Sequence, residues 1–206
     1  MITVVDYGAG NLRSIRRALE AAGATVTVSA RPADIAAADA VVLPGVGAAG
    51  AAMDRLNELK LIEPITATAR AGKPLLGICL GMQLMFGPQE EGDTVGLGLL
   101  PGRVRSIQAP VKVPHIGWNR ARVVRDGPLG TVGAEYDYYF VHSYVVDLDD
   151  PADTQAETTY GGIFPSVVVR HNLWGTQFHP EKSGDRGLEL MRSFVAQTNR
   201  GAGSAR

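Results

Sequence analysis

The chain has 206 residues, of which 45% are hydrophobic and 20% are charged, and its formal net charge is -1. This length suits one domain with a full hydrophobic core. The near-neutral charge offers no basic surface, so nucleic acid is not expected as a partner.

The chain offers no internal disulfide and no membrane anchor. Cys79 is its single cysteine, which fits a reducing compartment. No apolar run approaches the roughly 20 residues that a membrane span needs. Residues 1–6 have the pattern of a first strand and lack the charged and apolar regions of a signal peptide. We therefore expect a cytoplasmic protein that does not associate with membranes.

In the first half of the chain, short apolar runs alternate with helical patterns. Strands are predicted at residues 2–5, 25–28 and 40–43, and in the apolar run from 74 that leads into Cys79. Helices are predicted from Leu12 to the stop at Gly23, at 49–59, at 62–71 and at 80–86. Strands that alternate with helices indicate βαβ units and a mostly parallel sheet.

The second half is dominated by strand patterns. They lie at residues 103–107, 121–124, 138–141, 166–169 and 174–178, and a last amphipathic helix fits 187–198. Residues 201–206 have the composition of a disordered tail. No repeat or linker divides the chain, so one α/β domain is predicted over residues 1–200.

Three turns that follow strands are candidates for a binding site. They are residues 8–11, residues 44–47 and the turn at Cys79. Ligands of open α/β sheets bind beyond the carboxyl ends of the strands. The topology therefore gathers these turns at one edge of the sheet.

Cys79 is the central residue of the segment 77–81, Gly-Ile-Cys-Leu-Gly. A strand that enters a glycine-flanked turn before a helix has the layout of a nucleophile elbow, here with cysteine in the place of serine. We expect the glycines to permit a strained turn and the helix N-terminus to favour the thiolate. Taken alone, the segment fits a buried structural cysteine equally well.

A thiol nucleophile needs a base, and the base needs an orienting group. Of the four histidines, His179 stands out because Pro180 and Glu181 follow it. Proline biases the residue before it away from helix, and in an extended segment residues i and i+2 point to the same side. Glu181 could then orient the His179 ring. Taken alone, this segment is also compatible with a solvated surface turn.

A metal site is the weaker alternative for these residues. The chain has no second cysteine and no pair of histidines at the spacing of metal ligands. We expect neither a metal nor a cofactor.

Acyl transfer also needs hydrogen-bond donors aimed at a developing oxyanion. The N–H of Leu80 is one candidate because it follows the thiol at the start of a helix. The turn at residues 44–47 is another, since Gly45 and Gly47 would let the peptide around Val46 reorient. The same turn is also compatible with a simple strand-to-helix connection.

Several motifs together resemble a known family over nearly the whole chain. Residues 77–83 with residues 179–181 resemble the class I (triad) glutamine amidotransferases. Five segments narrow the resemblance to the glutaminase subunits of imidazole glycerol phosphate synthases: 6–12, 43–47, 115–119, 139–144 and 177–183. The resemblance implies a mixed sheet flanked by helices, with an added antiparallel strand region in the second half.

The resemblance also implies an activity and a partner. Such subunits hydrolyse L-glutamine to glutamate through a cysteine thioester and channel ammonia to a cyclase subunit, a (β/α)₈ barrel, within a heterodimer. The cyclase uses the ammonia on a ribulosyl phosphate intermediate, in histidine biosynthesis. The products are imidazole glycerol phosphate and aminoimidazole carboxamide ribotide.

Catalytic roles follow from the resemblance residue by residue. It implies that Cys79 is the nucleophile, His179 the general acid and base, and Glu181 the group that orients the histidine. Leu80 and Val46, with Gly47, would supply backbone donors to the oxyanion. The peptide at Val46 would rearrange only when the partner prompts it, so we expect the oxyanion site to be unformed in the isolated chain.

The resemblance also assigns binding roles. The residues implied to hold the substrate are Gln83, His142, Ser143 and Tyr144. The residues implied to face the cyclase are Asn11, Trp118 and Lys182. His115 and His171 are left as structural residues. Without the resemblance, His142 fits a core histidine and Trp118 a half-buried aromatic residue.

Three alternatives remain open. The chain could be a glutaminase that serves an anthranilate or nucleotide synthase, a stand-alone cysteine hydrolase or peptidase, or a non-catalytic assembly subunit. Residues 6–8 and 117–119 argue against the first of these. Intact Cys79, His179 and Glu181 argue against the last.

Overall fold

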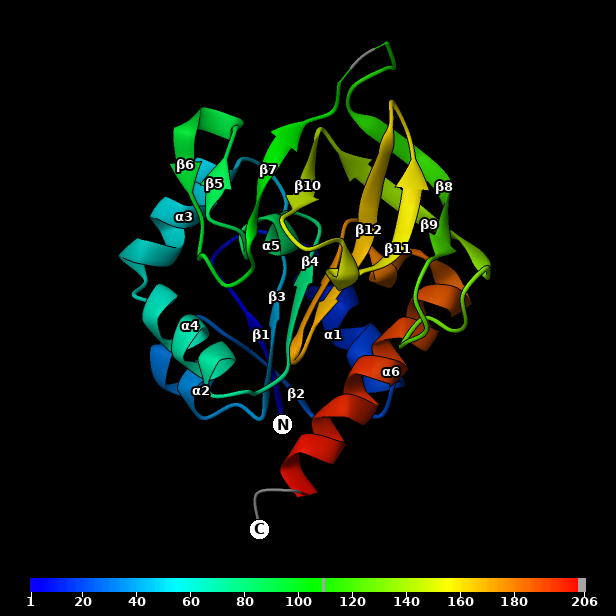
Figure 1. Cartoon of the computed structure of the whole chain (residues 1–206). Coiled ribbons are helices and arrows are strands. Elements are labelled where there is room, and N and C mark those ends of the chain that lie inside the picture. Colours follow the sequence, from blue (N-terminus) through cyan, green and yellow to red (C-terminus); the bar gives the residue numbers. More distant parts are fainter. Residues whose placement is uncertain (109, 204–206) are drawn as a thin grey trace.

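The computed structural model describes residues 1–108 and 110–203. Nine strands form one mixed sheet in the order β2-β1-β3-β4-β13-β12-β11-β8-β9 (Figure 1). The first five strands pair in parallel, and the remaining pairs are antiparallel. The predicted single α/β domain with a mixed sheet is confirmed for these residues.

The parallel half of the sheet is buried on both faces except at its edge strand β2, which is partly exposed. It consists of β2 (Val26–Ser29), β1 (Ile2–Val5), β3 (Ala40–Leu43), β4 (Leu75–Ile78) and β13 (Leu173–Thr176). In β3, Val41 and Leu43 pack into one hydrophobic cluster while Ala40 and Val42 pack into another. Burial on both faces explains why such strands appear in the sequence as continuous apolar runs.

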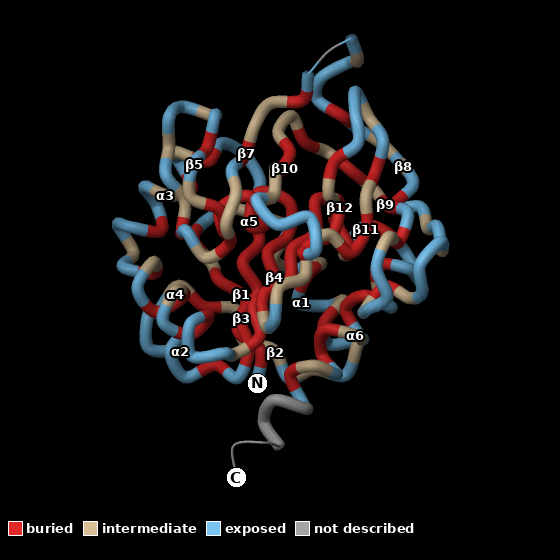
Figure 2. The backbone as a smooth tube through the Cα atoms, in the orientation of Figure 1, coloured by how far each residue is buried: buried red, intermediate tan, exposed pale blue. Residues whose placement is uncertain are grey.

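Helices form the layers that cover these two faces. Helices α1 (Leu12–Ala21) and α6 (Gly184–Gly203) cover one face. Helices α2 (Pro32–Ala36), α3 (Ala49–Glu58) and α4 (Ile62–Arg70) cover the other (Figure 1). Figure 2 shows the buried strands as a continuous band between the two layers. Within the described residues, no helix combines the length and apolar character that a membrane crossing requires.

The antiparallel half carries its own aromatic core. It consists of β12 (Ile163–Arg170), β11 (Thr154–Thr159), β8 (His115–Val123) and β9 (Glu135–His142). The rings of Tyr138 and Phe178 stack with centroids 3.8 Å apart, and Phe140 meets Phe178 edge to face. This core holds the segment after β13 against β9.

A second sheet of four strands lies beside the first. Its order is β10 (Tyr144–Leu148), β7 (Gly102–Ser106), β5 (Pro88–Gln89) and β6 (Thr94–Val95). Between β4 and β5 stands α5 (Leu80–Gln83), which is shorter than the predicted helix at 80–86. The Gln89 side chain donates to the carbonyls of Gln83 and Phe86, at 2.9 and 3.3 Å, where the chain leaves the helix.

Several elements differ from the prediction. Helix α2 and strands β10 and β11 were not predicted, because their short polar-containing sequences lack a clear periodicity. Strand β8 begins at His115 rather than at residue 121. Helix α6 continues to Gly203, beyond its apolar face, so residues 201–203 belong to the helix rather than to the predicted tail. The rest of that tail, 204–206, lies outside the described residues.

Candidate active site

Two neighbouring parallel strands bring Cys79 and His179 together. Cys79 follows β4, and His179 comes soon after β13, the next strand in the sheet. Thr176 is paired with Ile78, and the N–H of Cys79 donates to the Thr176 carbonyl at 2.7 Å. Sheet topology therefore closes a sequence gap of 100 residues, as the nucleophile-and-base hypothesis requires.

Backbone strain falls on Cys79 itself rather than on its glycines. Cys79 has φ 53° and ψ -112°, which side-chain-bearing residues rarely adopt. The neighbouring glycines are needed for close packing instead, since a Cβ on Gly81 would lie 1.9 Å from the Leu43 carbonyl oxygen. The strain expected in this turn is thus carried by Cys79, and Gly81 permits the turn by allowing the close approach of Leu43. Because α5 has only one turn, the expected help from a helix dipole is also small.

His179 and Glu181 form a buried pair. The Nδ1 atom of His179 lies 2.9 Å from Glu181 Oε1, and the two side chains are 3% and 0% exposed. The predicted extended geometry is wrong, because Pro180–Lys182 form a short 3₁₀ turn, η3. His179 itself is extended, and its N–H donates to the Tyr139 carbonyl at 3.0 Å. The pairing thus forms through η3 and its anchorage to β9.

The charge state of His179 depends on its two neighbours. Burial lowers the pKa of His179, but interaction with Cys79 and Glu181 outweighs burial and raises the pKa to about 9. Its Nε2 atom is buried and makes no hydrogen bond in the described residues. The Cys79 thiol instead donates to the Val141 carbonyl at 3.6 Å. In the neutral ring the proton on Nδ1 faces Glu181, so Nε2 is the atom that takes up the second proton, and the raised pKa favours this uptake.

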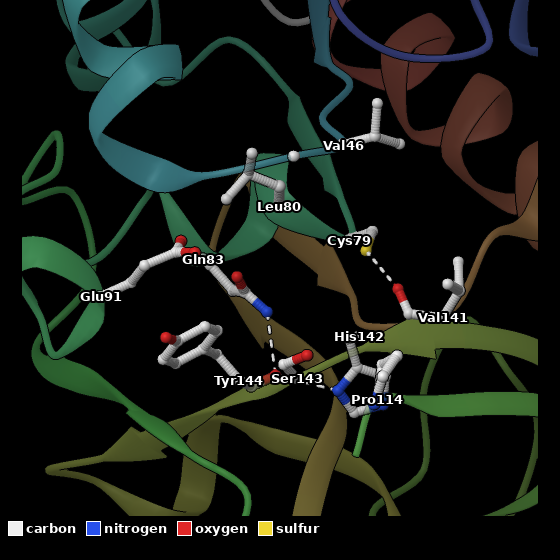
Figure 3. A pocket seen from close by; sticks show the side chains of 11 residues that line it. Val46, Cys79, Leu80, Gln83, Glu91, Pro114, Val141, His142, Ser143 and Tyr144 are labelled. Carbon is white, nitrogen blue, oxygen red and sulfur yellow. Dashed lines mark hydrogen bonds between the residues drawn. The ribbon is translucent and has the colours of Figure 1, made fainter.

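Cys79 opens onto a small cavity of about 250 Å³ (Figure 3). This volume is below the roughly 300–1,000 Å³ typical of pockets for drug-sized ligands. The cavity is lined by residues from several elements: Val46, Gly47, Cys79, Leu80, Gln83, Glu91, Pro114, Val141, His142, Ser143 and Tyr144. Eight of the predicted site residues thus share one cavity, which is the size expected for a small substrate.

The two glycines beside Val46 are not equivalent. Gly45 is packed against α5, where an added Cβ would lie 2.6 Å from the Gly81 nitrogen. Gly47 has φ 93° and open space around it. Val46 is 44% exposed, and its side chain points away from the other cavity residues in Figure 3. Conformational freedom in this turn therefore lies on the Gly47 side.

Comparison with known proteins agrees with this geometry. Residues 3–198 match the family described as class I glutamine amidotransferase. The chain belongs to this family. Proteins named imidazole glycerol phosphate synthase subunit HisH are similar along most of their length. The one from Halobacterium salinarum is 50% identical, with 94% of this chain and 92% of the relative covered. The one from Moorella thermoacetica is 47% identical, with 99% and 98% covered.

Solved structures share the fold of this amidotransferase. One described as a glutamine amidotransferase superposes with a TM-score of 0.77 and 18% identity, covering 97% of this chain and all of that one. The structure of PurLQS from Thermotoga maritima gives a TM-score of 0.74 at 19% identity, covering 95% and 97% of the two chains. These likenesses support the class I fold.

A chain of hydrogen-bonded neutral groups lies behind His142, which lines the cavity of this amidotransferase. His142 Nδ1 lies 2.9 Å from the Tyr144 carbonyl, which can only accept, so Nδ1 carries the proton. His142 Nε2 then accepts from His115 Nδ1 at 2.9 Å, and His115 Nε2 accepts from the Asn119 amide at 3.2 Å. Burial lowers the pKa of His142 to about 3 and that of His115 to about 4. His115, left as structural from the sequence, thus supports a cavity residue.

Two of the three predicted interface residues lie together. Trp118 is 61% exposed, and its ring meets that of Tyr139 edge to face with centroids 6.3 Å apart. The Lys182 ammonium lies 5.6 Å from the centroid of the same Tyr139 ring. Asn11 is exposed at the start of α1, a helix that packs near η3.

Other polar residues were missed by the sequence analysis. Gln177 and Val141 both contact the Cys79 sulfur, although neither was assigned a role. Gln177 stands two residues before His179, in a segment chosen for its His-Pro-Glu motif. Only the register of β13 places its side chain toward Cys79.

Across residues 1–108 and 110–203, no group of three or more His, Cys, Asp or Glu side chains is arranged to hold a metal.

Proposed function

We propose that this chain is the glutaminase subunit of an imidazole glycerol phosphate synthase, with Cys79, His179 and Glu181 as its catalytic triad. The main support is the buried histidine–carboxylate pair beside a strained cysteine that opens onto a small cavity. Extensive similarity to HisH subunits supports the choice of this synthase over those of anthranilate or nucleotide pathways. The chemistry is amide hydrolysis with transfer of ammonia.

The first half-reaction forms a thioester. The Cys79 proton passes to His179 Nε2, and the thiolate attacks the side-chain amide carbon of L-glutamine. His179 then gives its proton to the departing nitrogen, which leaves as ammonia while the γ-glutamyl thioester remains. In the second half, His179 takes a proton from water as the oxygen attacks the thioester, glutamate leaves, and His179 returns the proton to the departing Cys79 thiolate. The thioester divides one slow hydrolysis into two easier steps.

Backbone donors stabilise the oxyanion in each half-reaction. As the first residue of α5, Leu80 has an N–H without an intrahelical acceptor, next to the nucleophile. The second donor comes from the turn at Val46 and Gly47 after a peptide rearrangement. The open surroundings and positive φ of Gly47 support such a movement.

Substrate and partner bind to different residues of this site. Gln83, His142, Ser143 and Tyr144 hold the glutamine in the cavity. Trp118 and Lys182, together with Asn11, face the cyclase subunit in a heterodimer. Ammonia is mostly protonated in neutral water and ammonium is a poor nucleophile, so a closed path to the cyclase keeps it reactive. The complex works in the cytoplasm, where a single unpaired cysteine stays reduced.

One comparison of turnover tests this proposal. Glutamate release is measured for the wild type and for Cys79→Ala, each alone and with a cyclase subunit that carries its own ligand. We expect release to rise at least tenfold when the cyclase is present and to fall by several orders of magnitude in Cys79→Ala. Ser193→Ala serves as a control outside the cavity. Equal wild-type turnover with and without the cyclase would exclude a partner-dependent oxyanion site. Undiminished release by Cys79→Ala would exclude the mechanism.

A further inference from the structure

We propose that Gln177 is a further catalytic residue, which donates a hydrogen bond from its side-chain amide to the Cys79 sulfur and stabilises the thiolate. This inference rests on the proposed role of Cys79 as nucleophile. Gln177 Nε2 lies 3.7 Å from Cys79 Sγ, within the range of a hydrogen bond to sulfur. A donor aimed at the charged form of a group favours that form.

The position of Gln177 is fixed by the sheet. The residue directly follows β13 and is 0% exposed. Its backbone N–H donates to the Ser166 carbonyl on β12 at 2.9 Å. A buried amide held at both backbone and side chain loses little further freedom when the thiolate forms, so its interaction with the sulfur is preorganised.

The orientation of the Gln177 side-chain amide follows from its hydrogen bond to Gln83, which in turn donates to the Tyr144 carbonyl. The Tyr144 carbonyl can only accept, so the Gln83 atom 3.0 Å from it is the amide nitrogen. The same Gln83 nitrogen lies 3.0 Å from the Gln177 side chain, which must therefore present its oxygen there. The Gln177 nitrogen then faces Cys79. The sulfur meets an N–H donor, because the opposite amide orientation would break the bond to Gln83.

The two partners of the Cys79 sulfur favour opposite protonation states. The Val141 carbonyl accepts from the thiol at 3.6 Å and offers nothing to a thiolate. Gln177 offers a donor, which is most valuable once the sulfur is charged. When the proton moves to the free Nε2 atom of His179, the contact with Val141 becomes repulsive and the contact with Gln177 strengthens.

No other side chain in the described ranges donates to the Cys79 sulfur. Tyr7 is near enough that the charge of Cys79 adds to burial in raising the pKa of Tyr7 above its usual value, but its hydroxyl donates to the Pro44 carbonyl at 2.8 Å. His142 donates its one N–H, at Nδ1, to the Tyr144 carbonyl. His179 is the charged partner, with Glu181 behind it. Gln177 is thus the neutral, fixed donor of the site.

Alkylation of the single cysteine measures the thiolate directly. The rate of modification by iodoacetamide is followed from pH 5 to 10 in the wild type, in Gln177→Met and in Gln155→Met. Gln155 is also 0% exposed, but within residues 1–108 and 110–203 its side-chain amide has no hydrogen-bond partner. We expect Gln177→Met to react about tenfold more slowly near pH 7 and to reach half its maximal rate about one pH unit higher. Gln155→Met should follow the wild-type profile.

A second variant separates the donor from packing. Gln177→Glu keeps the shape and the oxygen that accepts from Gln83, but it places an acceptor against the sulfur. We expect its alkylation near pH 7 to be slowed at least as much as in Gln177→Met. A wild-type profile in both folded variants would overturn the proposal, and so would an equal shift in Gln155→Met. Alkylation needs no glutamine, so a glutaminase that survives Cys79→Ala would refute the proposed function without altering this result.

Discussion

Two buried histidines of the candidate site have pKa values shifted in opposite directions. His179 has a pKa raised to about 9, whereas that of His142 is lowered to about 3. Both are nearly inaccessible to solvent, at 2% and 6% exposure. Burial alone would lower both values, so depth does not separate them. The difference shows that their hydrogen-bond partners set the charge.

The partners of the two rings differ in kind. His179 lies between a carboxylate and a thiol, each of which can carry negative charge next to an imidazolium ion. His142 donates to a carbonyl and accepts from a second neutral histidine, with aromatic rings around the pair. One ring is suited to move protons and the other to hold a backbone carbonyl in place.

Removing the carboxylate should cause the largest change. In Glu181→Gln, the His179 ring keeps a hydrogen-bonding neighbour but loses the negative charge that helps to raise its pKa. We expect glutaminase kcat with the cyclase to fall by about 10² to 10⁴, the range seen when the orienting acid of a triad is removed. The pKa of His179, measured by NMR titration of the ring, should fall below about 9.

An exposed carboxylate provides the matched control for this change. Glu189 pairs with Arg186 on the outer surface of α6, and Glu189→Gln should leave both kcat and the titration of His179 as in the wild type. An unchanged kcat in Glu181→Gln would remove Glu181 from the catalytic triad. An unchanged titration would mean that Cys79 alone raises the pKa.

The parts of the site that follow strand ends were predictable from the sequence. Apolar runs before Cys79 and after residue 172 identified β4 and β13, and sheet topology then required their carboxyl ends to meet. The pairing of His179 with Glu181 was expected, but through an extended segment. Proline at the first position instead begins the 3₁₀ turn η3, and the pair forms across that turn.

The uncharged hydrogen-bonding residues of the site, His115 and Gln177, were not predictable in the same way. His115 and Gln177 act through hydrogen bonds to residues 27 and 98 positions away, which no local pattern encodes. Strand β10 was missed as well, although its first residue, Tyr144, provides the carbonyl on which the chain of donors ends. Their contributions depend on the register of β8 against β9 and of β13 against β4, which the sequence does not specify.

Removing the neutral His142 ring should weaken substrate binding rather than proton transfer. His142→Leu removes one of the two donors to the Tyr144 carbonyl and leaves the bond from Gln83. A hydrogen bond of about 1 kcal/mol is lost near the proposed glutamine site, so we expect KM for glutamine to rise about fivefold with a smaller change in kcat. A matching loss in kcat at unchanged KM would place His142 in the catalytic step instead. Urea unfolding of the variant establishes that it is folded.

The smallest expected effect concerns the pH dependence of stability. His115 has a folded pKa of about 4, below its ordinary value of 6.5. Between these values the unfolded chain binds a proton that the folded chain does not, so this histidine's contribution is present above pH 6.5 and is lost as pH falls toward 4. In His115→Phe the stacking on Tyr160 is kept but the titration is removed. The free energy of unfolding should then fall less steeply from pH 6.5 to 4.5, by about 1 kcal/mol per pH unit.

Urea unfolding at several pH values tests this difference in slope. His171→Asn, which removes an exposed histidine at a position with φ 54°, is the matched control because asparagine tolerates that backbone conformation. His115→Phe also costs His142 its donor, so its stability at pH 7 should be about 1 kcal/mol lower, while the slope changes independently. Parallel stability curves for His115→Phe and the wild type would show that His115 titrates alike in both states. The contrast with His179 would then rest on the lowered pKa of His142 alone.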